Sequence, residues 1–331
     1  MKLIITFCIG LFLNVSLWAQ DIHLSQYYTS NLSLNPAYTG NFDGDMRATL
    51  NSRSQWAQLS PAIKTNMLSI EKKIVRRPNE FGLGFILIND QLSAMFLTTN
   101  KMYLSGSYQK NIRGHFFRFG IQGGIVLMNI NLTNQSFPAQ WDNTSGDYNL
   151  TAPTGVTGGT QNNWKYLDIN TGVAWSHLFG KVKMSAGYAL FHMSHPKEGF
   201  SSASSSIPFR HVFNVSAMYY FSSRLYFMPH LLYMNSASAT DFIIGANANR
   251  KLTQNIGIMA GAGYRGSTVN SDAAIITAGM TYNRFIFGLS YDINVSDLSQ
   301  NARNKSAWEI SLIYTTPSRS SNKITLPCDR Y

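Results

Sequence analysis

Apolar and polar residues alternate along most of the chain with a period of two. In residues 283–296 the odd-numbered positions from Phe285 to Val295 are large and apolar, whereas the even-numbered positions are mostly small or polar. The same alternation recurs at 117–128, 165–175 and 255–266. A period of two predicts β-strands with one apolar face.

Many of the predicted strands have about ten residues, the length that crosses a bilayer at a tilt, whereas strands of soluble sandwiches average about five to six residues. Strand length therefore favours an all-β fold, a transmembrane antiparallel β-barrel of about 14 strands. The predicted strands are 45–56, 62–74, 80–90, 97–110, 114–129, 164–179, 181–193, 208–221, 223–235, 240–249, 254–265, 272–282, 284–295 and 306–316.

Long and tight connections alternate along this list of strands. The long ones, 130–163, 194–207 and 296–305, are all odd-numbered connections, and the even-numbered ones are tight. Bacterial barrels have short periplasmic turns and long outer loops, which predicts periplasmic N- and C-termini. We divide the chain into a signal peptide (1–19), an N-terminal periplasmic segment or plug (20–44), the barrel (45–316) and a C-terminal periplasmic tail (317–331).

The first residues predict a secretory signal peptide, with Lys2 before a short apolar run and a small residue at Ala19. That run is too short to span a membrane, and no later stretch predicts a helical span. Cys328 is the one cysteine after the signal peptide, which excludes a disulfide within the mature chain.

The chain carries a net charge of +11, although only 13% of its residues are charged, against roughly 25% in soluble domains. Nucleic acid is not the expected partner, because the chain is exported and no Lys/Arg-rich block appears on a helical pattern. The basic residues flank membrane spans and protect edges, or they form a docking surface for a periplasmic partner. They fall mainly at even-numbered connections and form a candidate basic periplasmic rim of Lys72, Lys73, Arg76, Arg77, Lys110, Arg113, Arg250 and Lys251.

Several ionisable residues lie within the predicted strands and are expected to face the lumen, because a charge on the lipid side costs about 2–4 kcal/mol at the midplane. They form either an internal salt-bridge network or a polar pathway for a substrate. These residues are Arg53, Glu71, Arg118, Lys183, Arg265, Asp292 and Glu309.

No motif predicts catalysis, a cofactor or a metal. The seven histidines lack metal-ligand spacing, and the GAGYRG stretch at 261–266 is followed by another strand instead of the helix that a dinucleotide site needs. We therefore expect a protein that is not an enzyme. A Ser–His pair assembled across strands, as in a membrane-embedded hydrolase, stays open as a weaker alternative.

A turn-rich segment, SLNPAYTG at 33–40, precedes the first strand. Pro36 disfavours helix at Asn35 and starts a turn, and Gly40 permits a second bend. We expect this segment to be a folded-in plug or a docking tag, with Tyr38 in the periplasmic mouth. Its candidate residues are Asn35, Pro36, Ala37, Tyr38 and Gly40.

Several stretches together resemble the PorP/SprF family of Bacteroidota outer-membrane proteins. Residues 20–40 are similar to that family's amino-terminal signature, which ends in Asn-Pro-Ala-Tyr-x-Gly, although Ile22 and His23 depart from it. The RSQW stretch resembles the family's Arg-x-Gln-Trp and adds Arg53 and Trp56 to the candidate residues. The last two strands and the ending resemble the family at 287–298, 308–314 and 328–331, with Asp329 where proline is expected.

The resemblance implies an outer-membrane component of the type IX secretion system, associated with gliding motility. Such a protein supports secretion or surface anchoring of a partner adhesin with a type IX carboxy-terminal domain. Its expected partners are that secreted protein, the secretion machinery with its periplasmic components, and outer membrane lipids. The alternative is an outer-membrane transport channel for a hydrophobic small molecule.

Overall fold

The computed structural model describes most of the chain from Leu24 to Ser318. The described residues are 24–55, 62–76, 79–92, 97–130, 136, 138–149, 151–153, 163–198, 205–237, 239–268, 273–295 and 306–318. The predicted signal peptide, Trp56, Arg77, Cys328 and most of the predicted C-terminal tail lie outside these residues.

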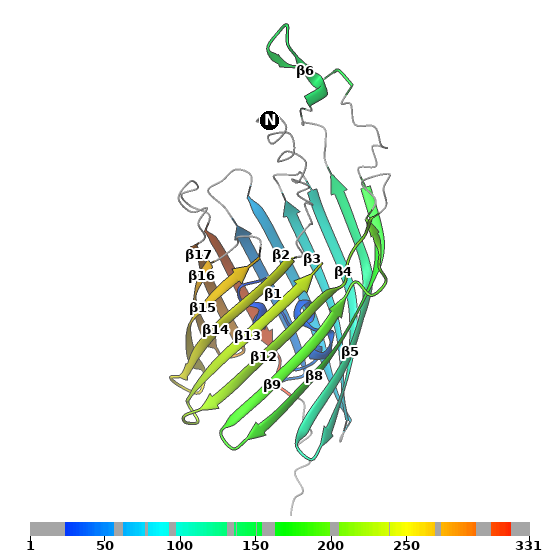
Figure 1. Ribbon diagram of the computed structural model, residues 1–331. Helices are drawn as coiled ribbons and strands as arrows, with labels where there is room; N and C mark the ends of the chain where they lie inside the picture. Colours follow the sequence, from blue (N-terminus) through cyan, green and yellow to red (C-terminus); the bar gives the residue numbers. More distant parts are fainter. Residues whose placement is uncertain are drawn as a thin grey trace, which may run out of the picture.

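The described strands form a closed antiparallel barrel (Figure 1). Each barrel strand pairs with its neighbours in sequence, and β18 pairs with β1 to close the barrel. All fourteen predicted strands are confirmed, because each coincides with a barrel strand to within a few residues at either end. The barrel strands are β1 (Met46–Gln55), β2 (Ile63–Arg76), β3 (Asn79–Leu92), β4 (Leu97–Ile112), β5 (His115–Ile130), β8 (Asn163–Phe179), β9 (Val182–Phe191), β12 (Arg210–Tyr220), β13 (Leu225–Ser236), β14 (Ala239–Lys251), β15 (Ile256–Ser267), β16 (Ala273–Tyr282), β17 (Phe285–Asn294) and β18 (Ala307–Thr315).

The connections sort to the two ends of the barrel as the sequence predicts. At one end, here called the short-turn end, the strands join through 77–78, 113–114, 180–181, 221–224, 252–255 and 283–284. The opposite end, the long-connection end, carries the remaining connections. The longest of these joins β5 to β8. It contains η4 (Pro138–Gln140) and a small hairpin of β6 (Trp141–Asp142) and β7 (Asp147–Tyr148), drawn beyond the barrel in Figure 1. The connection from β9 to β12 contains β10 (Lys197–Glu198) and β11 (Ser205–Ser206).

The alternation along each strand separates an apolar outer face from a polar lumen. On β17, Phe287, Leu289 and Tyr291 are exposed, whereas Ser290 and Asp292, at the alternate positions, are buried. The same division recurs around the barrel, because large exposed apolar side chains occur on every barrel strand. An apolar outer face with a polar interior is the pattern of a barrel that lies in lipid.

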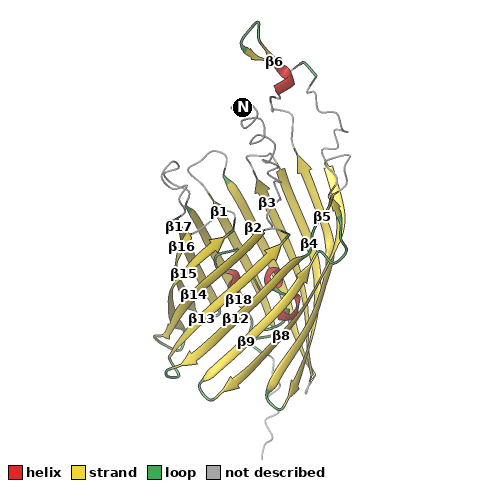
Figure 2. Ribbon diagram, in the orientation of Figure 1, coloured by secondary structure: helices red, strands yellow, loops and turns green. Residues whose placement is uncertain are grey.

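The segment before β1 lies inside the barrel. It consists of three short helices, η1 (Tyr27–Thr29), α2 (Asn31–Leu34) and η2 (Pro36–Tyr38), which Figure 2 shows in red within the ring of strands. We call residues 24–45 the lumenal segment. Among the described residues, no helix is long and apolar enough to span a membrane.

The outward position of Leu289 gives a test of the barrel's orientation in lipid. Leu289→Arg places a charge near the middle of the apolar belt and should destabilise the folded barrel by about 2–4 kcal/mol. Leu252→Arg, in a turn at the short-turn end, should cost about 0–1 kcal/mol. Denaturant titrations in lipid vesicles measure both, and equal costs at the two positions would contradict this orientation.

Candidate functional site: the lumenal segment and its anchors

Four buried charges hold the first described residues of the lumenal segment. The guanidinium of Arg53 on β1 pairs with Asp292 on β17 at 2.8 Å and with Glu309 on β18 at 3.1 Å. Arg265 on β15 pairs with the same oxygen of Asp292 at 3.0 Å. Two positive and two negative charges balance, which buried ions require because an unpaired charge is costly away from water. We call these four residues the ionic node.

The ionic node binds the lumenal segment directly through Ser25 and Gln26. The backbone N–H groups of Ser25 and Gln26 donate to the two carboxylate oxygens of Glu309, at 2.8 and 3.1 Å. The Ser25 hydroxyl donates to Asp292 Oδ2 at 2.7 Å and accepts from Arg53 Nη1 at 2.6 Å. The node therefore joins four strands and the lumenal segment beside the seam where β1 meets β18.

A second ion pair holds the other end of the segment. Arg47 on β1 donates to Glu71 Oε1 on β2 from Nε at 2.9 Å and from Nη2 at 2.6 Å. The second oxygen of Glu71 accepts from the backbone N–H of Gly40 at 2.9 Å. Gly40 has a φ of +72°, a left-handed conformation that glycine adopts without steric cost. The expected bend at Gly40 is therefore present, and a buried carboxylate fixes it.

The Asn-Pro-Ala-Tyr turn packs against the wall between these anchors. Asn35 Oδ1 accepts from the backbone N–H of Ala37 at 2.8 Å, which caps η2. The Asn35 amide donates to the backbone carbonyls of Val173 and Tyr188 at 3.1 and 3.2 Å, on the neighbouring strands β8 and β9. One asparagine thus both shapes the turn and attaches it to two strands.

Glycines on the inner wall make room for this turn. A Cβ at Gly120 on β5 would collide with the backbone of Pro36 and Ala37, and one at Gly172 on β8 would collide with Asn35 Oδ1. The turn therefore approaches the wall more closely than any side chain at these two positions would allow.

Three tyrosines of the segment fill the lumen, and burial raises the pKa of each. The hydroxyl of Tyr27 forms a hydrogen bond with His230 Nδ1 on β13 at 2.9 Å. Tyr38 accepts from Asn214 Nδ2 on β12 at 2.8 Å, which places its ring deep in the lumen instead of at the mouth. Burial raises the pKa of Tyr28 to about 12. All three phenols are therefore neutral near neutral pH. A change of pH around neutrality should leave their packing unchanged.

The candidate residues from the sequence divide into two groups. Asn35, Pro36, Ala37, Tyr38, Gly40 and Arg53 all lie in the lumen and are buried. The basic residues are instead at the short-turn end, where most are exposed: Lys72, Lys73, Arg76, Lys110, Arg113, Arg250 and Lys251. Lys181, Arg224 and Arg284 lie in the short turns themselves and are exposed too.

Most strand residues expected to face the lumen are paired there. Arg53, Glu71, Arg265, Asp292 and Glu309 are all buried in ion pairs. Arg118 is half-buried and donates to Ser176 Oγ at 3.3 Å, and Lys183 is exposed near the short-turn end. This arrangement fits the internal-network interpretation.

Sequence reasoning did not single out Ser25, Gln26, Asn214 or Gly120. Their roles depend on contacts between residues far apart in the chain. The sequence does place Gly120 on the inward face of its strand, where the absence of a side chain leaves space on the lumenal wall.

A second buried cluster lies on the wall beside α2. Asp168 Oδ2 accepts from the Tyr103 hydroxyl at 2.9 Å and lies 3.0 Å from His192 Nδ1. Among the described residues, no group of three or more His, Cys, Asp and Glu side chains could hold a metal ion.

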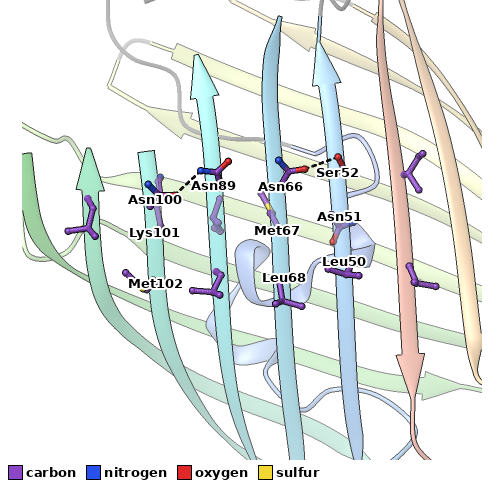
Figure 3. A pocket seen from close by; sticks show the side chains of 15 residues that line it. Leu50, Asn51, Ser52, Asn66, Met67, Leu68, Asn89, Asn100, Lys101 and Met102 are labelled. Carbon is purple, nitrogen blue, oxygen red and sulfur yellow. Dashed lines mark hydrogen bonds between the residues drawn. The ribbon is translucent and has the colours of Figure 1, made fainter. Parts of the chain in front are cut away.

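A sizeable cavity lies on the outside of the barrel. Its volume is about 690 Å³, and its lining includes the outward-facing Leu50, Leu68 and Met102 (Figure 3). A smaller cavity of about 30 Å³ lies in the lumen between Leu32, Ser33 and the walls of β3, β4 and β5. The larger hollow therefore opens to lipid and does not form a passage along the lumen.

Comparison with known proteins matches residues 16–314 to the family described as type IX secretion system membrane protein PorP/SprF. The chain belongs to the PorP/SprF family. This membership and the closed barrel place the protein in the outer membrane. A search of the curated proteins finds no match.

Among solved structures, this PorP/SprF protein is similar to the CymD monoaromatic hydrocarbon channel, with a TM-score of 0.52, 11% identity, and coverage of 87% of this chain and 93% of that one. It is also similar to the Ralstonia pickettii toluene transporter TbuX (0.49, 10%, 87% and 94%) and to the Pseudomonas putida toluene transporter TodX (0.49, 11%, 86% and 92%). At this identity the likeness to CymD shows the fold. The family is a secretion component and these neighbours are channels or transporters; none is described as an enzyme.

Removing the central cation of the ionic node should weaken the whole barrel. Arg53→Met leaves Asp292 and Glu309 without their main partner, and an uncompensated buried charge costs about 3–5 kcal/mol. Denaturant titration of the folded barrel measures the loss. Arg224→Met, at an exposed turn position, is the matched control and should leave stability unchanged. Equal stability of the two variants would show that the node does not hold the barrel.

The close approach at Gly120 can be tested within a single strand. Gly120→Ala should displace the turn at Pro36 and destabilise the protein by about 1–3 kcal/mol, as overpacking does. Hydrogen exchange at Ala37 and Tyr38 should speed up, because their N–H bonds depend on the seated turn. Gly123→Ala on the same strand is the control, since nothing lies within 4 Å of its Cβ. Unchanged exchange in Gly120→Ala would contradict the seating of the turn.

Proposed function

We propose that this PorP/SprF protein is a non-enzymatic barrel that supports secretion or surface anchoring of an exported partner protein. The partner would be an adhesin, or another secreted protein, that carries a type IX carboxy-terminal domain. The protein would act through its two ends, and its lumen would stay closed.

The observation that carries this proposal is the filled lumen. Residues 24–45 cross the interior from the ionic node to Gly40, and their side chains are largely buried. A barrel closed by its own chain at both anchors is suited to be a rigid platform, and a platform presents docking surfaces.

The long-connection end is the side we propose for the exported partner. Its hairpin carries Trp141 and Tyr148, which are 45% and 42% exposed and pack edge to face with ring centroids 4.9 Å apart. The hairpin is braced by Gln140, whose carbonyl accepts from Asn149 N and whose amide donates to Ala152 O, both at 2.8 Å. Exposed tryptophan and tyrosine on a braced element are typical of binding hot spots.

The short-turn end is the side we propose for the secretion machinery. Among the described residues, eleven exposed or half-exposed basic residues gather there, Lys183 included, against the acidic Asp43, Asp45 and Glu80. An excess of one charge favours a partner of the opposite charge and speeds its association. We infer that a periplasmic component with an acidic surface docks at this end.

The alternative, a channel for a hydrophobic small molecule, would need a passage along the lumen. The similarity to a hydrocarbon channel concerns the fold alone and is no evidence for such a passage. The observed apolar cavity faces outward. We therefore retain the secretion role as the main proposal. Uptake of a labelled apolar compound that depends on this protein would favour the alternative.

The secretion role is tested in a deletion strain that carries a tagged partner adhesin. Loss of the gene should abolish surface retention of the adhesin, and the wild-type gene should restore it. The Trp141→Ala/Tyr148→Ala variant should reduce retention about tenfold or more, because each hot-spot residue contributes about 2 kcal/mol or more. Phe81→Ala/Tyr108→Ala removes an aromatic pair from the barrel wall and is the matched control.

Two results would count against this account. Full surface retention in the deletion strain would remove the secretion role itself. If the deletion strain loses surface retention of the adhesin but the hairpin variant restores it, the secretion role stands. Only the assignment of the hairpin as the docking site would then be wrong.

A further inference from the structure

The outer cavity is lined by two adjacent rows of residues that face outward and are paired across neighbouring strands. We call each such row a rung. Along one rung, register pairing joins five aliphatic side chains across neighbouring strands: Leu312, Leu50, Leu68, Leu87 and Met102. The next rung toward the long-connection end joins four polar side chains: Ser52, Asn66, Asn89 and Asn100. Ile310 and Leu127 flank this polar rung. We call these two rungs the outer groove.

The wall is concave at the outer groove. Leu104 and Leu167, which face outward elsewhere on β4 and β8, are 69% and 70% exposed. Leu68 and Leu87 face outward too but are only half-exposed, because their neighbours shield them. The hollow in front of them has a volume of about 690 Å³.

The polar rung is only partly satisfied by the protein. The Ser52 hydroxyl donates to Asn66 Oδ1 at 2.8 Å, and Asn89 Nδ2 donates to Asn100 Oδ1 at 2.8 Å, as Figure 3 shows. Both acceptors are thus the amide oxygens of their asparagines. The amide nitrogens of Asn66 and Asn100 have no acceptor among the described residues. Amide N–H groups at an apolar boundary favour a site where an acceptor is available.

The polar rung also marks the upper limit of the apolar belt in this sector. Below it lie the leucine rung and then Ile70, Phe85 and Leu104, and above it lie Lys64, Gln91 and Thr98. Apolar residues face the hydrocarbon core, and polar residues begin at the interface. The free amide donors are therefore at the depth where the acyl chains of a lipid join its polar head.

We propose that the outer groove binds one diacyl glycerophospholipid. Its acyl chains lie on the leucine rung, and its ester carbonyls accept from the Asn66 and Asn100 amides. The groove opens away from the lumen, so its occupant comes from the membrane and not from the filled interior. Ester carbonyls supply the acceptors that these two amides lack, and the hydrocarbon chains match the apolar rung beneath.

Native mass spectrometry of the intact, delipidated protein tests this with two lipids. The probes are dipalmitoyl phosphatidylethanolamine and its diether analogue, which has the same chains and head but no ester carbonyls. The wild type should bind the diester about fivefold or more tightly than the diether, since each hydrogen bond contributes about 1 kcal/mol. Asn66→Leu/Asn100→Leu should remove this preference.

A second variant tests the apolar half of the site. Leu68→Trp/Leu87→Trp should fill the groove and reduce binding of both lipids, whereas Leu104→Trp/Leu167→Trp on the exposed wall should bind like the wild type. A heat-dependent gel shift verifies that each barrel is folded. Equal binding by all variants, or no preference for the diester, would overturn the proposal. A further outcome would also overturn it: Leu68→Trp/Leu87→Trp binds lipid like the wild type but no longer co-purifies with a membrane protein. The groove would then be a protein interface.

Discussion

The ionic node is the constraint on which the rest of the structure depends. Arg53 and Glu309 are only 2% and 0% exposed, so each of their charges needs a partner that stays in place. Those partners come from β1, β15, β17, β18 and from Ser25 and Gln26. Closing the barrel and seating the lumenal segment are therefore coupled, because the carboxylates that pair with Arg53 across the closing strands also accept the hydrogen bonds of Ser25 and Gln26.

The coupling explains why the lumenal segment is so closely fitted along its length. It is fixed at the ionic node and again at Glu71. Between these anchors the Asn35 turn packs against the wall, where Gly120 and Gly172 have no side chain that would collide with it. With the lumenal segment packed in the interior, our proposals concern three outer surfaces. They are the aromatic hairpin, the basic short-turn end and the lipid-facing wall.

The sequence predicted the strands and their order well, because lipid imposes one apolar face on each strand and leaves a period of two. It also predicted that Arg53, Asp292 and Glu309 face inward, since a lipid-facing charge is costly. It could not predict their pairing, because Arg53 and Glu309 are 256 residues apart and meet only when β18 closes on β1. Tyr38 was expected at the mouth and lies deeper, since Asn214 is its partner on a distant strand. The outer groove was not foreseen, because concavity depends on the closed shape of the wall.

The central claim is that the chain closes its own barrel, and single-channel conductance in planar bilayers tests it most directly. The folded wild-type protein should pass almost no ion current. A variant lacking residues 24–40, verified as a folded barrel by its gel shift, should conduct steadily. Wild-type conductance equal to that of the truncated barrel would contradict the claim.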